Sequence, residues 1–227
     1  MDSPPVVIAL LTYARTNYAL ATIAAMLRNW RYANTLWYVA DDGSAPEHVA
    51  TVLAALDSEH VVGWHSERRG YGYSATRAWF AAHEHADVTL FLEDDWELKQ
   101  EFDPTYYVQT LMQHDDIGMI RLSHLPINLK SETCGYYVGG HGAIYLRMSA
   151  GQQYAFSGNP ALRHRRAREA WGAYPEGLNP GDTELAYDHQ IQQRGGPSIL
   201  WPVGVGEWGV FGHIGAVPSY EVKKGGE

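Results

Sequence analysis

The chain has 227 residues, of which 45% are hydrophobic and 19% charged, and its 26 acidic and 17 basic side chains give a formal net charge of −9. The length fits one domain of generous size, and the 12% of aromatic residues exclude an intrinsically disordered chain, which lacks apolar side chains to bury. The acidic balance argues against a protein that coats nucleic acid or anionic membranes through bulk charge.

The expected compartment follows from cysteine usage and from the apolar runs. The single cysteine, Cys134, excludes an internal disulfide and any multi-cysteine metal site, and a lone thiol is typical of a reducing compartment. Residues 1–5 carry no secretory signal, and the apolar runs are far shorter than the roughly 20 residues that a membrane span needs. We therefore expect a cytoplasmic protein with no membrane span.

The first half of the chain alternates strand-like and helix-like segments. Continuous apolar runs predict buried strands, whereas helical spacing or a proline in a first turn predicts helices. The expected elements are a strand at 6–11, a helix at 17–30, a strand at 36–40, a helix at 46–56, a strand at 61–64, a helix at 73–85 and a strand at 88–92. This rhythm predicts an α/β fold in which helices sandwich a mostly parallel sheet.

The rhythm changes after about residue 115. Strands are expected at 119–122, 143–146 and 199–203, helices at 161–171 and 183–194, a glycine-rich loop around 135–142, and a loop-like tail from 204 onward. Because no repeat or low-complexity linker interrupts the chain, we expect a single domain over 1–227 with two functional halves, 1–96 and 97–227.

Polar clusters follow the first four expected strands. In an open parallel sheet, ligands bind beyond the carboxyl ends of the strands, so these clusters are expected to line one crevice. Any one of them alone is more often a simple turn before a helix. The clusters are Thr12–Arg15, Asp41–Ser44, Glu67–Gly70 and Glu93–Trp96.

The acidic triplet Glu93-Asp94-Asp95 is the most informative cluster. Three adjacent carboxylates repel one another unless a cation or a basic side chain compensates them. Hard oxygen ligands suit Mg²⁺ or Mn²⁺, which typically bridge to substrate phosphates. A solvated acidic turn is the alternative, but the position at a strand end beside Trp96 favours metal binding.

Four segments together resemble, in order and spacing, the nucleotide-sugar glycosyltransferases of the GT-A fold, and the large family 2 group in particular. The resemblance implies a Rossmann-like, nucleotide-sugar-binding half at 1–96 and an acceptor-binding half at 97–227. The chain departs from the family pattern in two places, with Ala-Thr-Arg where Ala-Arg-Asn is usual and Glu-Asp-Asp in place of Asp-x-Asp. The four segments are 6–15, 38–44 (YVADDGS), 69–77 (RGYGYSATR) and 92–96 (LEDDW).

The resemblance also implies roles for individual residues. The donor is expected to be a nucleoside diphosphate-sugar, with a UDP-sugar favoured, and the cofactor Mn²⁺ or Mg²⁺. The metal is assigned to Asp95 first and Asp94 second, with Glu93 and Trp96 as donor or acceptor contacts. The nucleotide contacts are expected to be Thr12, Tyr13, Arg15, Asp41, Asp42, Arg69 and Arg77.

A motif in the second half supplies a candidate general base. Residues 181–185 (GDTEL) resemble the Glu-Asp-x-x-Leu stretch of inverting members, in which the aspartate deprotonates the acceptor hydroxyl. The expected base is therefore Asp182, although Gly181 replaces the usual acidic neighbour. The alternative is that Asp182 only caps a helix. Glu184 and Asp188, four residues apart, are the reserve candidates.

Two glycine-rich segments lie near the end of the given sequence. Residues 212–215 (GHIG) resemble the His-x-Gly segment with which many GT-A enzymes complete the metal or diphosphate site, which makes His213 a candidate ligand. Residues 204–209 match the dinucleotide pattern G-x-G-x-x-G, but no helix-like segment follows, so we expect a loop that places Trp208 over the donor.

The basic run Arg163–Arg168 stands out in an acidic protein. Such a run is usually a solvated helix face, and the alternative is that it binds phosphates of the donor or of an acceptor such as nucleic acid, with Arg166 as a contact. Tyr136 and Tyr137 could stack on a sugar or base, although buried packing is the more ordinary role.

The sequence thus predicts a metal-dependent glycosyltransferase that transfers a sugar to an acceptor hydroxyl in one inverting displacement. The acceptor, either a modified base in nucleic acid or a small soluble glycan, stays open, as does the oligomeric state. One alternative is a sugar-phosphate nucleotidyltransferase, which is disfavoured because 12–15 contains no glycine. The other is a non-catalytic nucleotide- or glycan-binding module.

Overall fold

The computed structural model describes residues 3–123, 135–138, 144–150, 155–202 and 209–215. The first half follows the predicted alternation, with boundaries shifted by only a few residues, and Pro46 begins its helix as expected. Its elements are β1 (Val6–Thr12), α1 (Thr16–Asn29), β2 (Thr35–Asp41), α2 (Pro46–Ala54), the one-turn helix η1 (Ser58–His60), β3 (Val61–Ser66), α3 (Tyr71–Ala82) and β4 (Val88–Glu93).

The second half contains more strands than the sequence predicts. Its elements are β5 (Trp96–Leu98), α4 (Thr105–Gln113), β6 (Ile117–Arg121), β7 (Gly135–Val138), β8 (Ile144–Met148), β9 (Ala161–His164), α5 (Arg165–Trp171), α6 (Pro180–Arg194), β10 (Ser198–Pro202) and β11 (Phe211–His213). Three predictions are wrong: the helix expected at 161–171 begins as strand β9, the loop around 135–142 contains β7, and the tail contains β11. Each of these strands pairs with a distant part of the chain or with a neighbouring hairpin strand, and local patterns do not encode such pairing.

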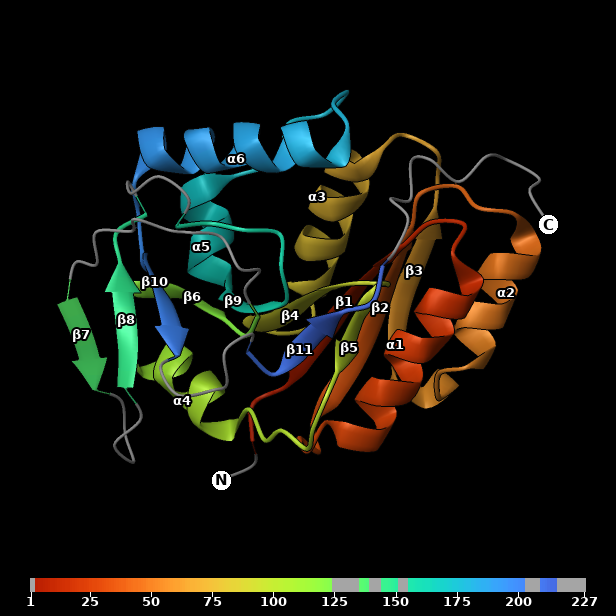
Figure 1. The fold of residues 1–227 in the computed structure, drawn as a ribbon, viewed down its shortest axis with the longest axis horizontal. Helices are drawn as coiled ribbons and strands as arrows, with labels where there is room; N and C mark the ends of the chain where they lie inside the picture. The colour runs from red at the N-terminus through yellow and green to blue at the C-terminus, as the bar shows by residue number, and fades with distance from the viewer. Residues whose placement is uncertain (1–2, 124–134, 139–143, 151–154, 203–208, 216–227) are drawn as a thin grey trace.

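In the described part of the chain, nine strands form one sheet in the order β3-β2-β1-β4-β9-β6-β10-β8-β7, and β11 pairs with β5 in a small second sheet (Figure 1). Strands β8 and β9 run against the other strands of the large sheet. The sheet is therefore mostly parallel, and the predicted α/β class is confirmed. Since β9 lies between β4 and β6, the same sheet runs through both halves of the chain.

Two hydrophobic clusters cover the two faces of this sheet, because successive side chains of a strand point to opposite faces. Ile8 and Leu10 of β1 belong to the cluster that contains side chains of α1, α2 and α4, whereas Val7 and Ala9 belong to the cluster that contains side chains of α3, α5 and α6. The result is the predicted sandwich of helices around a sheet. None of the helices in the described residues is both long enough and apolar enough to cross a bilayer.

Candidate active site

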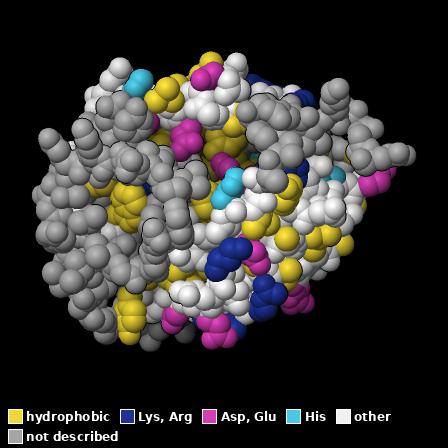
Figure 2. All heavy atoms as spheres, in the orientation of Figure 1, with side chains coloured by type: hydrophobic (Ala, Val, Ile, Leu, Met, Phe, Trp, Pro, Cys, Tyr) yellow, Lys and Arg dark blue, Asp and Glu magenta, His cyan; other side chains and the backbone are white. Residues whose placement is uncertain are grey.

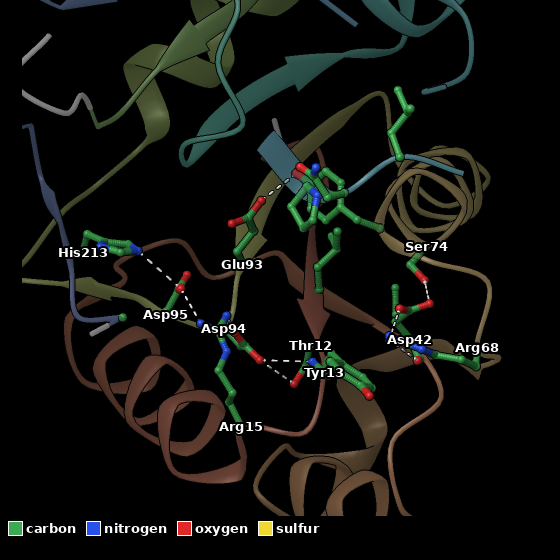
Figure 3. Close-up of a pocket in the computed structure, with 17 residues that line it drawn as sticks. Thr12, Tyr13, Arg15, Asp42, Arg68, Ser74, Glu93, Asp94, Asp95 and His213 are labelled. Atoms are coloured by element: carbon green, nitrogen blue, oxygen red, sulfur yellow. Dashed lines mark hydrogen bonds and ion pairs between the residues drawn. The ribbon is translucent and has the colours of Figure 1, made fainter. Parts of the chain in front are cut away.

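A pocket of about 500 Å³ opens beyond the carboxyl ends of β1, β2 and β4 (Figure 3). It receives side chains from all four predicted polar clusters, which confirms that they line one crevice. Acidic side chains and a histidine are visible near the middle of this face of the molecule (Figure 2). The lining comprises Leu11, Thr12, Tyr13, Arg15, Ala40, Asp42, Arg68, Tyr71, Ser74, Glu93, Asp94, Asp95, Leu178, Asn179, Pro180, His213 and Gly215.

Arg15 and the end of β1 hold the acidic turn that follows β4. The hydroxyl of Thr12 and the backbone N–H of Tyr13 donate to Oδ2 of Asp94, at 2.8 and 3.2 Å. The Arg15 guanidinium forms an ion pair with Asp94 and donates to Oδ2 of Asp95 at 2.8 Å (Figure 3). Arg15 is therefore a built-in counter-ion shared by two neighbouring carboxylates.

Burial changes the protonation of the two carboxyl groups at the end of β4. Burial and, to a lesser degree, the neighbouring Asp95 carboxylate raise the pKa of Glu93 to about 8, while the Tyr71 hydroxyl that donates to Glu93 at 2.6 Å opposes the shift. Burial likewise raises the pKa of Asp94 to about 6, against the opposing effect of Arg15. Both pKa shifts favour the protonated forms, so this wall carries less charge near neutral pH than its composition suggests.

Asp95 and His213 form a site that fits a divalent cation. Oδ1 of Asp95 is buried and has no hydrogen-bond partner among the described residues, and Nε2 of His213 lies 3.3 Å from its Oδ2. A Cβ at position 215 would lie 2.4 Å from that Oδ2, so glycine is needed for the chain to approach so closely. A carboxylate oxygen and an imidazole nitrogen together suit Mn²⁺. No cluster of three metal-ligating side chains occurs in the residues that the structure describes, so water and phosphate would have to complete the coordination.

The opposite wall of the pocket is organised by Asp42. Its carboxylate accepts hydrogen bonds from the backbone N–H groups of Arg69 and Gly70, at 3.1 and 2.7 Å, and pairs with the Arg68 guanidinium at 2.5 Å. The same guanidinium lies 4.0 Å from the ring centroid of Tyr13. Arg68 was not among the predicted residues, although it belongs to the cluster after β3, because a loop sequence does not indicate which of two adjacent arginines faces a pocket.

Three predicted nucleotide contacts are not part of the pocket lining in the described structure. Asp41 is fully buried and accepts hydrogen bonds from Ser44 and from Ser66, so it stabilises the turn after β2. Arg69 pairs with Glu176 at 3.2 Å on the surface. Arg77 lies near Tyr38 instead: burial raises the pKa of Tyr38, and the Arg77 charge opposes that shift.

The basic run 163–168 has a structural role that the sequence did not predict. Arg163 is fully buried and donates to the Tyr174 hydroxyl at 2.5 Å, which excludes both a solvated face and a phosphate contact for it. Arg166 donates to the carbonyls of Leu111 and Ile117, at 2.8 and 2.7 Å, at the end of α4. Arg166 is not among the residues that line the pocket, because β9 runs antiparallel to β4 and ends at the opposite edge of the sheet; its contact with donor or acceptor stays a prediction.

The start of α6 forms the outer rim of the pocket. Asn179, not Asp182, is the N-cap residue of α6, so the helix-capping alternative for Asp182 is wrong. Asp182 is exposed in the first turn, just beyond the lining residues 178–180. Glu184 points inward and accepts a hydrogen bond from the Gly158 N–H at 2.6 Å, and Asp188 is buried.

The two predicted tryptophan contacts have different outcomes. Trp96 is buried and packs against the ring of His213, with 5.0 Å between the ring centroids. This contact helps to fix the orientation of the candidate metal ligand. Trp208 lies outside the described residues, as do Cys134 and the side chains of Tyr136 and Tyr137.

No known protein family matches this sequence, and no curated protein is similar to it in sequence. Solved structures do resemble its fold. A mannosyltransferase from Pyrobaculum calidifontis, solved with GDP-Man and Mn²⁺, superposes with a TM-score of 0.56 at 14% identity over 83% of this chain and 50% of its own. GalNAc-T7, solved with UDP, GalNAc and Mn²⁺, gives a TM-score of 0.61 at 12% identity over 88% of this chain and 43% of its own.

S. aureus TarS 1–349, in complex with UDP-GlcNAc, gives a TM-score of 0.59 at 12% identity over 87% of this chain and 58% of its own. The chain thus spans about half the length of the structures that it matches. The fold is the GT-A fold of these glycosyltransferases, as the sequence resemblance implied.

Proposed function

We propose that this chain is a metal-dependent glycosyltransferase that moves a sugar from a nucleoside diphosphate-sugar to an acceptor hydroxyl. The observation that carries the proposal is the partnerless, buried Oδ1 of Asp95 beside His213, in a pocket at the carboxyl edge of a GT-A sheet. The three structurally similar glycosyltransferases named above were solved with GDP- or UDP-containing ligands, and two of them with Mn²⁺, which supports the same ligand classes here.

The two walls of the pocket have different roles in donor binding. Tyr13, Asp42 and Arg68 bind the nucleoside, since an aromatic face, a carboxylate and a guanidinium supply stacking and directed hydrogen bonds. Thr12 and Arg15 do not contact the donor in this assignment. Both bind the acidic turn and fix the positions of Asp94 and Asp95. This assignment keeps Tyr13 and Asp42 from the predicted nucleotide contacts and adds Arg68, which also lines the pocket.

Asp95 and His213 would hold the divalent cation, with Asp94 nearby but bound to Arg15. When bound, the cation neutralises the charge that develops on the diphosphate leaving group. The Asp95 carboxylate would attract the cation to the sheet edge, and Gly215 leaves space beside that carboxylate.

The transfer step is an inverting displacement at the anomeric carbon of the donor. The acceptor hydroxyl loses its proton to a carboxylate oxygen of Asp182 while its oxygen forms the new bond to the anomeric carbon. The bond from that carbon to the diphosphate oxygen breaks at the same time, and its electron pair leaves with the nucleoside diphosphate. Asp182 is suited to this role because it is exposed at the pocket rim.

Calorimetric titration with UDP- and GDP-sugars, with and without Mn²⁺, tests donor and metal binding. We expect one class of donor to bind only when the cation is present. In Asp95→Asn, adding the cation should no longer increase donor binding. Asp115→Asn is the matched control, because that carboxylate is fully exposed and lies outside the pocket. If no nucleotide binds under either condition, the proposal is wrong.

Product analysis tests the chemistry. Asp182→Asn should reduce transfer by about 10²-fold or more while leaving donor affinity unchanged, as expected for loss of a general base. Unchanged transfer in this variant would remove Asp182 from the mechanism, and loss of transfer in Glu184→Gln alone would shift the role to Glu184. Donor binding without any transfer or donor hydrolysis would instead identify a binding module, and inversion at the anomeric carbon would be read by NMR.

A further inference from the structure

The first turn of α6 contains a closed pair of side-chain contacts between Asn179 and Asp182. Oδ1 of Asn179 accepts the backbone N–H of Asp182 at 2.9 Å, and its Nδ2 donates to Oδ2 of Asp182 at 2.6 Å. The first contact is the ordinary helix cap. The second contact is not needed for capping, because an N-cap residue completes its role when it accepts from the first turn.

The orientation of Asn179 is fixed by these two contacts. A flipped amide would place its NH₂ against the Asp182 N–H and its oxygen against the carboxylate, so only one orientation satisfies both partners. The backbone carbonyl of Asn179 is also bound, since it accepts the N–H and the hydroxyl of buried Thr183, both at 2.8 Å. Four hydrogen bonds thus restrain Asn179, although it is exposed; it belongs to the pocket lining, whereas Asp182 does not.

We infer that Asn179 is a positioning residue for Asp182 in the proposed transfer reaction, and this inference depends on the proposed function. The amide holds one carboxylate oxygen, Oδ2, and leaves Oδ1 to take the proton from the acceptor hydroxyl; in the described structure no hydrogen bond reaches Oδ1. Holding a base in one orientation removes rotational freedom that would otherwise have to be lost as the acceptor reacts. Because Asn179 lines the pocket, its contact with Asp182 also fixes the base beside the pocket rim.

Two variants separate this role from helix capping. Asn179→Ser retains a good N-cap oxygen but has no NH₂ group to hold the carboxylate. Asn179→Asp also retains the cap and places a carboxylate against Asp182, so that the two groups resist ionising together. We expect Asn179→Ser to lower kcat about 10-fold or more, with an unchanged donor Kd and a Tm close to that of the parent protein.

For Asn179→Asp we expect the acidic limb of the pH profile of kcat to move upward by about one pH unit, because the added carboxylate resists ionisation of the base that it contacts. The positioning role itself is read from Asn179→Ser, and wild-type kcat in that variant at every pH would overturn the inference. The parallel Asp182→Asn measurement separates the two levels: if Asp182→Asn is inactive while both Asn179 variants behave as wild type, only the positioning role fails. If Asp182→Asn is fully active, the assignment of the base fails first.

Discussion

Removal of the Arg15 guanidinium should destabilise the protein in a strongly pH-dependent way. Its side chain is only 9% exposed, and those of its partners Asp94 and Asp95 are 1% and 8% exposed. Removing one partner of such a buried pair leaves an uncompensated charge and typically costs about 3–5 kcal/mol of unfolding free energy. Arg15→Met has a similar length and no charge, so we expect this loss at pH 8 in metal-free buffer.

The loss should shrink as the pH falls, because Asp94 can be protonated. The folded-state pKa of Asp94 is already raised to about 6, above its unfolded value, so ionising this group costs stability as the pH rises through that range. Without Arg15 the pKa of Asp94 rises further. The unfolding free energy of the variant therefore keeps falling above pH 6, where the contribution of Asp94 in the parent protein no longer changes. Below pH 5 Asp94 is protonated in both proteins. The difference in unfolding free energy between them should then come mainly from the lost contact between Arg15 and Asp95.

Urea unfolding followed by tryptophan fluorescence at pH 5, 6.5 and 8 measures this difference. Arg28→Met is the matched control, because Arg28 is 64% exposed and its contact to Glu97 is 3.7 Å long, so its loss should cost less than about 1 kcal/mol at every pH. Mn²⁺ at about 100 times its Kd should recover up to about 2.7 kcal/mol if it binds Asp95 in the folded state only. A difference between Arg15→Met and the parent that is the same at all three pH values would refute the reasoning.

Two further predictions concern the backbone next to the site and the core. Ala14 has a φ of +55°, so Ala14→Val should lower the unfolding free energy by about 2 kcal/mol while Ala14→Gly changes it by less than about 1 kcal/mol, both measured by urea unfolding. Equal effects of the two substitutions would contradict this. His83 is fully buried, and burial lowers its pKa to about 3, with the Arg168 charge acting in the same direction. Because only the unfolded chain takes up this proton between pH 6.5 and 3, the protein should lose about 2 kcal/mol through His83 from pH 7 to pH 5, a loss that is absent in His83→Gln; parallel pH profiles of the two proteins would rule it out.

The first half of the fold could be predicted from the sequence because its elements are locally encoded. Apolar runs such as 6–11 and 88–92 are buried on both faces, and parallel strands need the intervening helices that the periodicity indicates. The strand β9 could not be predicted, because its four residues contain good helix formers and lead directly into α5. What makes it a strand is pairing on both sides, with β4 and with β6, and no local pattern reports that pairing.

The candidate site was also predicted only in part from the sequence. The sequence predicted which strand ends supply the polar residues, and His213 does lie beside Asp95. It did not distinguish Asp41 from Asp42, whose side chains separate at the end of β2: one supports the turn and the other faces the pocket. It also offered Asp182 as a possible helix cap, the alternative to its role as the base, whereas the backbone places Asn179 at the N-cap and Asp182 three residues later.

The insertion of β9 between β4 and β6 has a consequence for how the protein is made on the ribosome. When β4 emerges, one of its edges has no partner until 161–164 has also left the exit tunnel, and the acidic turn after β4 waits for β11 before it can meet His213. An unpaired strand edge in a nascent chain is prone to associate with other chains. Synthesis therefore passes through a stage in which β1 to β4 are present but one edge of β4 is unpaired, and the pocket becomes complete only when His213 and Gly215 have emerged.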